Sequence, residues 1–261
     1  MQPFEQNRNA ASAGAVRSEA QVDQGLRTFM LGVYNHMVLG LAISALVALG
    51  INKLAVATSV DQAVARMGNS IYLTSFGKAL YGSPLMWVVA LAPLAFIFFF
   101  SFRFEKMSAA AARMTFMIFA AVMGASLSVL LIRYTGASVV QVFFITAAAF
   151  GSVSLWGYTT NRSLSGMGSF LMMGLVGIIL ASLVNLFLGS SMMQMGISII
   201  GVLLFAGLTA YDTQKLKEMY LYGNFDQETA TKVSVYGALS LYLDFINMFQ
   251  YLLYLVGNRN N

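Results

Sequence analysis

Seven apolar stretches, each long enough to cross a lipid bilayer, account for most of this sequence. A transmembrane α-helix needs about 20 mostly apolar residues. The chain is 58% hydrophobic and only 10% charged, whereas soluble domains carry roughly 25% charged residues. Because backbone polar groups in lipid must be satisfied internally, we predict an all-α polytopic membrane protein with seven transmembrane helices. The stretches are residues 28–51, 84–103, 112–132, 137–158, 166–189, 191–213 and 233–256.

The flanking and connecting segments predict the domain organisation. Residues 1–26 are polar and mixed in charge, without the apolar segment of a signal peptide. We expect a disordered cytoplasmic tail there, followed by a single seven-helix domain over residues 27–261. The long connection, residues 52–83, has apolar residues that allow a short interfacial helix. The fifth stretch is rich in glycine, which permits close helix packing in lipid.

Lys and Arg residues predict the orientation, since cytoplasmic loops carry an excess of them. With the N-terminus inside, ten of the 15 basic residues fall on the cytoplasmic side and five on the other. We therefore expect a cytoplasmic N-terminus and an external C-terminus. The net charge of +5 is small and spread among loops, which argues against a nucleic-acid partner.

The content of cysteine and histidine excludes several kinds of catalytic site. There is no Cys, which excludes a thiol nucleophile and Cys-ligated zinc. The single histidine, His36, excludes a His-based metal cluster or catalytic triad, and we interpret it as a packed or interfacial residue. We expect neither an enzyme nor a permanently bound cofactor.

Two acids lie inside the last two helices, one in each. An ionisable residue in a span costs roughly 2.5–3.5 kcal/mol on insertion scales and usually faces the bundle interior or a wet cavity. Asp212 lies eleven residues before Gly223, where we expect a helix from Ser191 to Tyr222 to end. Asp244 lies eleven residues after Val233, where the apolar pattern resumes. At ~1.5 Å per residue, both lie at the same depth from the loop.

Each acid also has a purely structural interpretation. Asp244 shares a helix face with Ser240 and Asn247, a supporting polar face that is predicted to point into the bundle. These two side chains could instead hold Asp244 by hydrogen bonds alone. Asp212 is followed at i+3 by Lys215, so it could be an interfacial acid with a surface partner, a pair worth about 0–1 kcal/mol.

A close carboxylate pair would take up either a proton or a cation. At ~4 Å and an effective dielectric of 20, the repulsion between two carboxylates is ~4 kcal/mol, so the pair would share one proton. Hard oxygen ligands also suit Ca²⁺. Asp212 and Asp244 are therefore candidate ligands of a pH-sensitive cation site, although two acids alone do not specify the cation. Arg103, at the end of the second stretch, either turns inward to pair with Asp212 or extends outward to the interface.

The segments LFAGLTAYDTQKLKEMY and ALSLYLDFINMFQYLL resemble the transmembrane Bax inhibitor motif family, in its bacterial inner-membrane branch. The resemblance covers roughly residues 20–261. It implies a fold in which the seventh helix is central among the other six. It also implies a pH-sensitive calcium leak channel, in which Asp212 and Asp244 share a proton-dependent hydrogen bond and Arg103 competes for Asp212. The expected partners are the lipid bilayer, Ca²⁺ and H⁺.

Two other functions compete with the channel. An intramembrane aspartyl protease also carries acids on neighbouring helices, but here the second acid lies in YLDF rather than in a Gly-x-Gly-Asp setting. The other alternative is a membrane-embedded modulator that binds membrane proteases or other complexes without ion flux of its own. The sequence favours the cation channel over both.

Overall fold

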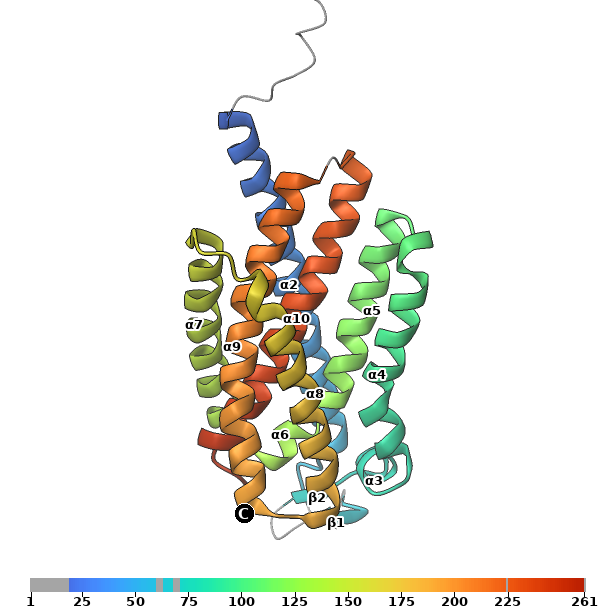
Figure 1. Cartoon of the computed structure of the whole chain (residues 1–261). Helices are drawn as coiled ribbons and strands as arrows, with labels where there is room; N and C mark the ends of the chain where they lie inside the picture. Colours follow the sequence, from blue (N-terminus) through green and yellow to red (C-terminus); the bar gives the residue numbers. More distant parts are fainter. Residues whose placement is uncertain (1–18, 60–62, 68–70, 224, 261) are drawn as a thin grey trace, which may run out of the picture.

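The computed structural model describes residues 19–59, 63–67, 71–223 and 225–260. Seven of its helices are long and apolar enough to cross a membrane, which confirms the predicted all-α polytopic fold (Figure 1). They are α2 (Glu19–Ala55), α4 (Leu85–Arg103), α5 (Ala109–Leu127), α7 (Gly136–Thr159), α8 (Ser165–Leu188), α9 (Ser191–Tyr222) and α10 (Gln227–Val256).

The first helix and the long connection differ in detail from the sequence prediction. α2 begins at Glu19, before the predicted boundary at residue 27, and the predicted tail over residues 1–18 lies outside the described residues. The connection forms a short antiparallel pair, β1 (Ala65–Met67) and β2 (Ile71–Leu73), followed by α3 (Ser75–Tyr81). The Thr74 hydroxyl caps α3 by accepting from Gly77 N at 3.1 Å.

Short helical segments complete the connections. The 3₁₀ turn η2 (Phe104–Lys106) joins α4 to α5, and α6 (Leu130–Arg133) precedes α7. At the end of α8, Gly189 has φ +62°, the left-handed conformation that ends many helices and that glycine adopts without steric cost.

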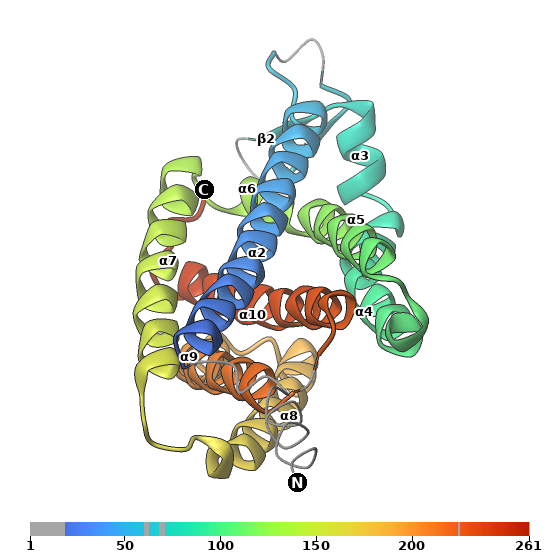
Figure 2. The same cartoon turned by 90° about the horizontal axis from the view of Figure 1, so that it is seen from above.

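The last helix packs against several others. α10 contacts α2, α5, α7 and α9, while α4 packs against α5 and α8 against α9 (Figures 1 and 2). The central placement of α10 among the six other spans stays a prediction.

Small residues bring α9 close to its neighbours. A Cβ added at Gly157 of α7 would collide with the backbone carbonyl of Ala210, so α7 and α9 touch through their backbones. A Cβ at Gly168 of α8 would meet the ring of Tyr211. Gly168, a glycine of the predicted fifth span, therefore lies in a close helix contact of the kind expected from the glycine content of that span.

A hydrogen-bonded contact fixes α10 to α2 and α5. Tyr242 is fully buried, and its hydroxyl lies 2.6 Å from the Ser44 hydroxyl of α2. Ser44 Oγ lies 2.7 Å from the carbonyl of Ala120 in α5. The rings of Phe116 and Phe119 pack edge-on against Tyr242, with centroids 5.7 and 5.8 Å away. Three helices thus meet at one side chain, two residues before Asp244.

Candidate functional site

The two acids lie on the antiparallel helices α9 and α10. α9 runs from Ser191 to Tyr222, as predicted, although Gly223 has an ordinary φ of −82° rather than a left-handed one. α10 begins at Gln227, earlier than the restart of the apolar pattern at Val233, and its N-cap is Asp226. The equal count of residues from the loop therefore does not explain how the acids come together.

Packing between α9 and α10 brings the acids level instead. The rings of Phe205 and Tyr251 stack with centroids 6.0 Å apart. Phe205 is seven residues before Asp212, and Tyr251 is seven residues after Asp244. Since residues seven apart share a helix face, both carboxylates lie two turns from this contact, on the facing sides of the two helices. They are close enough to interact electrostatically.

The two carboxylates differ in their surroundings. Asp244 is 5% exposed, and among the described residues its Oδ2 is buried without a hydrogen-bond partner. Asp212 is half-buried and lies within electrostatic range of Lys215. A buried carboxylate oxygen without a donor is costly when ionised, so it needs a proton, water or a cation. We therefore expect a proton, water or a cation to bind the pair mainly at Asp244.

The supporting polar face does not hold Asp244 by hydrogen bonds in the described part of the chain. Asn247 Nδ2 donates to the carbonyl of Leu243, 2.8 Å away within its own helix. Ser240 is half-buried one turn from Asp244. The hydrogen bonds that would make Asp244 a purely structural residue are thus not observed there.

Arg103 is exposed at the end of α4. α4 packs against α5, and Figures 1 and 2 show it well separated from α9. The exposed side chain is compatible with the outward alternative, and no interaction between Arg103 and Asp212 is observed within the described residues. Their pairing stays a prediction.

Polar residues that follow Asp212 form contacts that the sequence analysis missed. Thr213 Oγ1 donates to the carbonyl of Thr209 at 2.7 Å and lies 2.9 Å from Ser154 Oγ, which lies 2.7 Å from the Tyr34 hydroxyl. Because the single hydrogen of Thr213 goes to a carbonyl, Ser154 donates to Thr213 and Tyr34 donates to Ser154. This directed chain joins α2, α7 and α9 beside Asp212.

Gln214 anchors the connection between α7 and α8. Its Oε1 accepts from Leu164 N at 2.6 Å, and its Nε2 donates to the carbonyl of Arg162 at 2.8 Å. Thr213 and Gln214 directly follow the acid at the end of an apolar stretch, and that polar run was the signal available in the sequence.

The fold and the site define a polytopic α-helical membrane protein that buries a carboxylate pair between two of its helices. Residues 26–261 match the family model described as "Inhibitor of apoptosis-promoting Bax1". The chain belongs to this family, the Bax inhibitor-1 family, as its motifs had indicated.

Bacterial relatives match the chain over nearly its whole length. An uncharacterised protein of Caulobacter vibrioides is 44% identical over 251 residues, which cover 96% of each chain. The inner membrane protein YbhL of Escherichia coli K12 is 42% identical over 244 residues, 93% of this chain and 96% of YbhL. Protein RP147 of Rickettsia prowazekii is 41% identical, with 92% and 93% covered.

Proposed function

We propose that the protein is a pH-sensitive cation leak channel controlled by Asp212 and Asp244, with Ca²⁺ as the permeant ion. The observation that carries the proposal is the buried Oδ2 of Asp244, which has no hydrogen-bond partner among the described residues and lies beside a second acid. We place the channel in the bacterial inner membrane with its N-terminus in the cytoplasm. The location is supported by the relative YbhL, and the orientation by the excess of basic residues on that side.

A proton and a cation compete for the same oxygen atoms. At low pH a proton on the pair removes the charge that attracts a cation, and it allows one carboxyl group to donate to the other. At higher pH the two carboxylates repel each other and attract Ca²⁺. Proton uptake should therefore close the path, and proton loss should open it.

The small number of protein ligands favours an ion that passes through over one that stays bound. Ca²⁺ prefers about six to eight oxygen ligands. Over the described ranges, no group of three or more His, Cys, Asp or Glu residues is placed to hold a metal ion. Two carboxylates, supported by Ser240 and Asn247, would hold the ion only briefly. The proposal includes no catalytic residue and no permanently bound cofactor.

Calcium flux into dye-loaded liposomes tests the proposal. Purified wild type should give a pH-dependent flux, and Asp244→Asn should lose most of the pH response. The matched control is Glu228→Gln, which removes one acid from the same helix, α10, outside the pair. If empty liposomes and liposomes with wild type show the same flux, the channel proposal is wrong. The protein would then fit a modulator of membrane complexes.

A further inference from the structure

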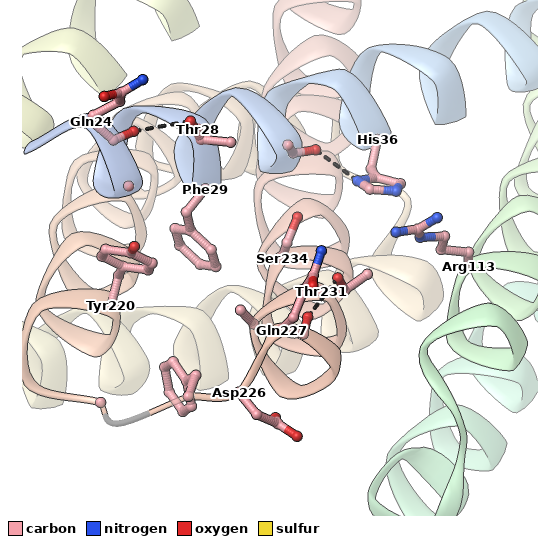
Figure 3. Close-up of a pocket in the computed structure, with 15 residues that line it drawn as sticks. Gln24, Thr28, Phe29, His36, Arg113, Tyr220, Asp226, Gln227, Thr231 and Ser234 are labelled. Atoms are coloured by element: carbon pink, nitrogen blue, oxygen red, sulfur yellow. Dashed lines mark hydrogen bonds between the residues drawn. The ribbon is translucent and has the colours of Figure 1, made fainter. Parts of the chain in front are cut away.

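A polar pocket opens at the end of the bundle that carries the loop between α9 and α10. Its volume is about 630 Å³, and neither Asp212 nor Asp244 lines it. The first half of α2, the end of α9 and the start of α10 form its walls, and Arg113 of α5 closes one side (Figure 3). The pocket is therefore separate from the carboxylate pair.

An imidazole and a guanidinium gather on one side of this pocket. His36 Nδ1 lies 2.6 Å from the carbonyl of Gly32. Because a carbonyl only accepts, Nδ1 carries a hydrogen, and Nε2 donates to a ligand only in the doubly protonated imidazolium, the form that a bound anion would favour. Figure 3 shows His36 and Arg113 pointing toward one another. Neither side chain has an acidic partner within the described residues, so this side lacks a neutralising charge.

The acid that lines the pocket is already engaged elsewhere. Asp226 accepts from Thr229 N at 2.9 Å as the N-cap of α10. Hydrogen bonds from the side chain and backbone of Thr229 hold the pKa of Asp226 below its usual range. In Figure 3 its carboxylate points away from His36 and Arg113. Asp226 therefore does not supply the missing negative charge.

A buried hydroxyl of α10, that of Ser234, forms the inner wall of the pocket. Ser234 is 5% exposed, and its Oγ has no hydrogen-bond partner among the described residues. A Cβ at Gly32 would lie 3.1 Å from this oxygen, a tight contact that the glycine of α2 avoids. Buried hydroxyls in native proteins are normally paired, and a ligand oxygen at this position would pair it.

The opposite wall is aromatic. The rings of Phe29 and Tyr220 stack with centroids 5.1 Å apart and an interplanar angle of 28°. Phe225 lines the pocket as well. The site thus offers a guanidinium, an imidazole and a hydroxyl on one side and an apolar surface on the other.

We propose that this pocket binds a phosphate-bearing anion, with its phosphate oxygens at Arg113, His36 Nε2 and Ser234 Oγ. Guanidinium groups bind phosphate by paired, charge-assisted hydrogen bonds, and a hydroxyl adds a neutral donor. The aromatic wall accommodates the organic part of the ligand. Such a ligand comes either from the headgroup of a membrane phospholipid or from a soluble phosphate compound. The site goes beyond the proposed cation path and does not depend on it.

Binding of inorganic phosphate to the purified full-length protein in a neutral detergent tests the site. Phosphorus NMR line broadening over a titration gives the affinity. Arg113→Gln should weaken binding about tenfold or more, the effect of losing a charge-assisted hydrogen bond. Arg162→Gln is the matched control, because it removes an exposed arginine from the connection between α7 and α8, outside the pocket. Equal losses in the two variants would mean non-specific attraction and would overturn the proposal.

Ser234→Ala separates a ligand contact from a structural role. Removing a buried, unpaired hydroxyl should leave the melting temperature unchanged or raise it, while phosphate binding weakens severalfold. A lower melting temperature with unchanged binding would show that Ser234 serves the fold instead, and would contradict the proposed contact. Asp244→Asn should leave phosphate binding unchanged, so failure of the channel proposal is distinguishable from failure of this one.

Nanodiscs distinguish the two sources of the phosphate group. The phosphate titration is compared in phosphatidylcholine alone and in phosphatidylcholine with phosphatidic acid. If phosphatidic acid blocks inorganic phosphate in the wild type, a lipid headgroup occupies the pocket. If the titrations in detergent and in both bilayers agree, the ligand is soluble, because phosphatidylcholine also carries a phosphate and would otherwise compete. Absence of saturable phosphate binding in detergent and in both bilayers would refute the site.

Discussion

Removing the hydroxyl of Ser44 should destabilise the protein more than removing that of Tyr242, although the two share one hydrogen bond. The Tyr242 hydroxyl lies 2.6 Å from Ser44 Oγ, and Ser44 Oγ also lies 2.7 Å from the carbonyl of Ala120 and 3.0 Å from that of Gly40. Carbonyls only accept, so the single hydrogen of Ser44 goes to them and Tyr242 is the donor in the shared bond.

The direction of the shared bond sets the two magnitudes. Tyr242→Phe removes one neutral hydrogen bond and leaves Ser44 bonded to Ala120, so we expect a loss of about 0.5–1.5 kcal/mol. Ser44→Ala leaves a fully buried tyrosine hydroxyl without its acceptor, which costs about 1–3 kcal/mol. When residue 242 is already Phe, Ser44→Ala leaves no tyrosine hydroxyl without an acceptor. It should therefore reduce the free energy of unfolding by about 1 kcal/mol less than in the wild type.

Equilibrium unfolding in bicelles of wild type, both single variants and the double variant measures these differences in the free energy of unfolding. Ser152→Ala is the control, because it removes an exposed hydroxyl that donates within its own helix to Ala148 at 2.8 Å. It should change stability by less than about 0.5 kcal/mol. Additive single effects, or a larger loss for Tyr242→Phe than for Ser44→Ala, would refute the assigned direction of the bond.

Three further predictions concern the acids, Arg103 and the orientation. In the liposome assay, Asp212→Asn and Asp244→Asn should each abolish most of the pH response, and the double variant should add little, because each acid titrates against the other; additive losses would show independent acids. Arg103→Ala should leave the pH profile in place if the exposed Arg103 only extends to the interface, whereas pairing with Asp212 would move the profile to higher pH. A C-terminal reporter should be active outside the cytoplasm and one inserted at residues 223–226 inside it, and the reverse pattern would invert the assigned orientation.

The sequence determines the spans of this protein because the requirement for spanning is local. About 20 apolar residues and internally satisfied backbone groups suffice for a helix in lipid, so composition located all seven spans. The bounds of α9 also follow from nearby residues, since the Ser190 hydroxyl caps its first turn by accepting from Met193 N at 3.2 Å. The acids Asp212 and Asp244 were visible for the same reason, as single acids within the apolar stretches 191–213 and 233–256.

Only the tertiary structure decides which faces of these helices meet. The hydroxyl chain joins Tyr34 to Ser154, which is 120 positions further along the chain. The pocket likewise combines His36 of α2 with Arg113 of α5 and Ser234 of α10. Helix faces in lipid are selected by close backbone approach and interhelical hydrogen bonds rather than by hydrophobicity. No local pattern encodes these contacts, because each depends on the shape of a surface that a distant segment supplies.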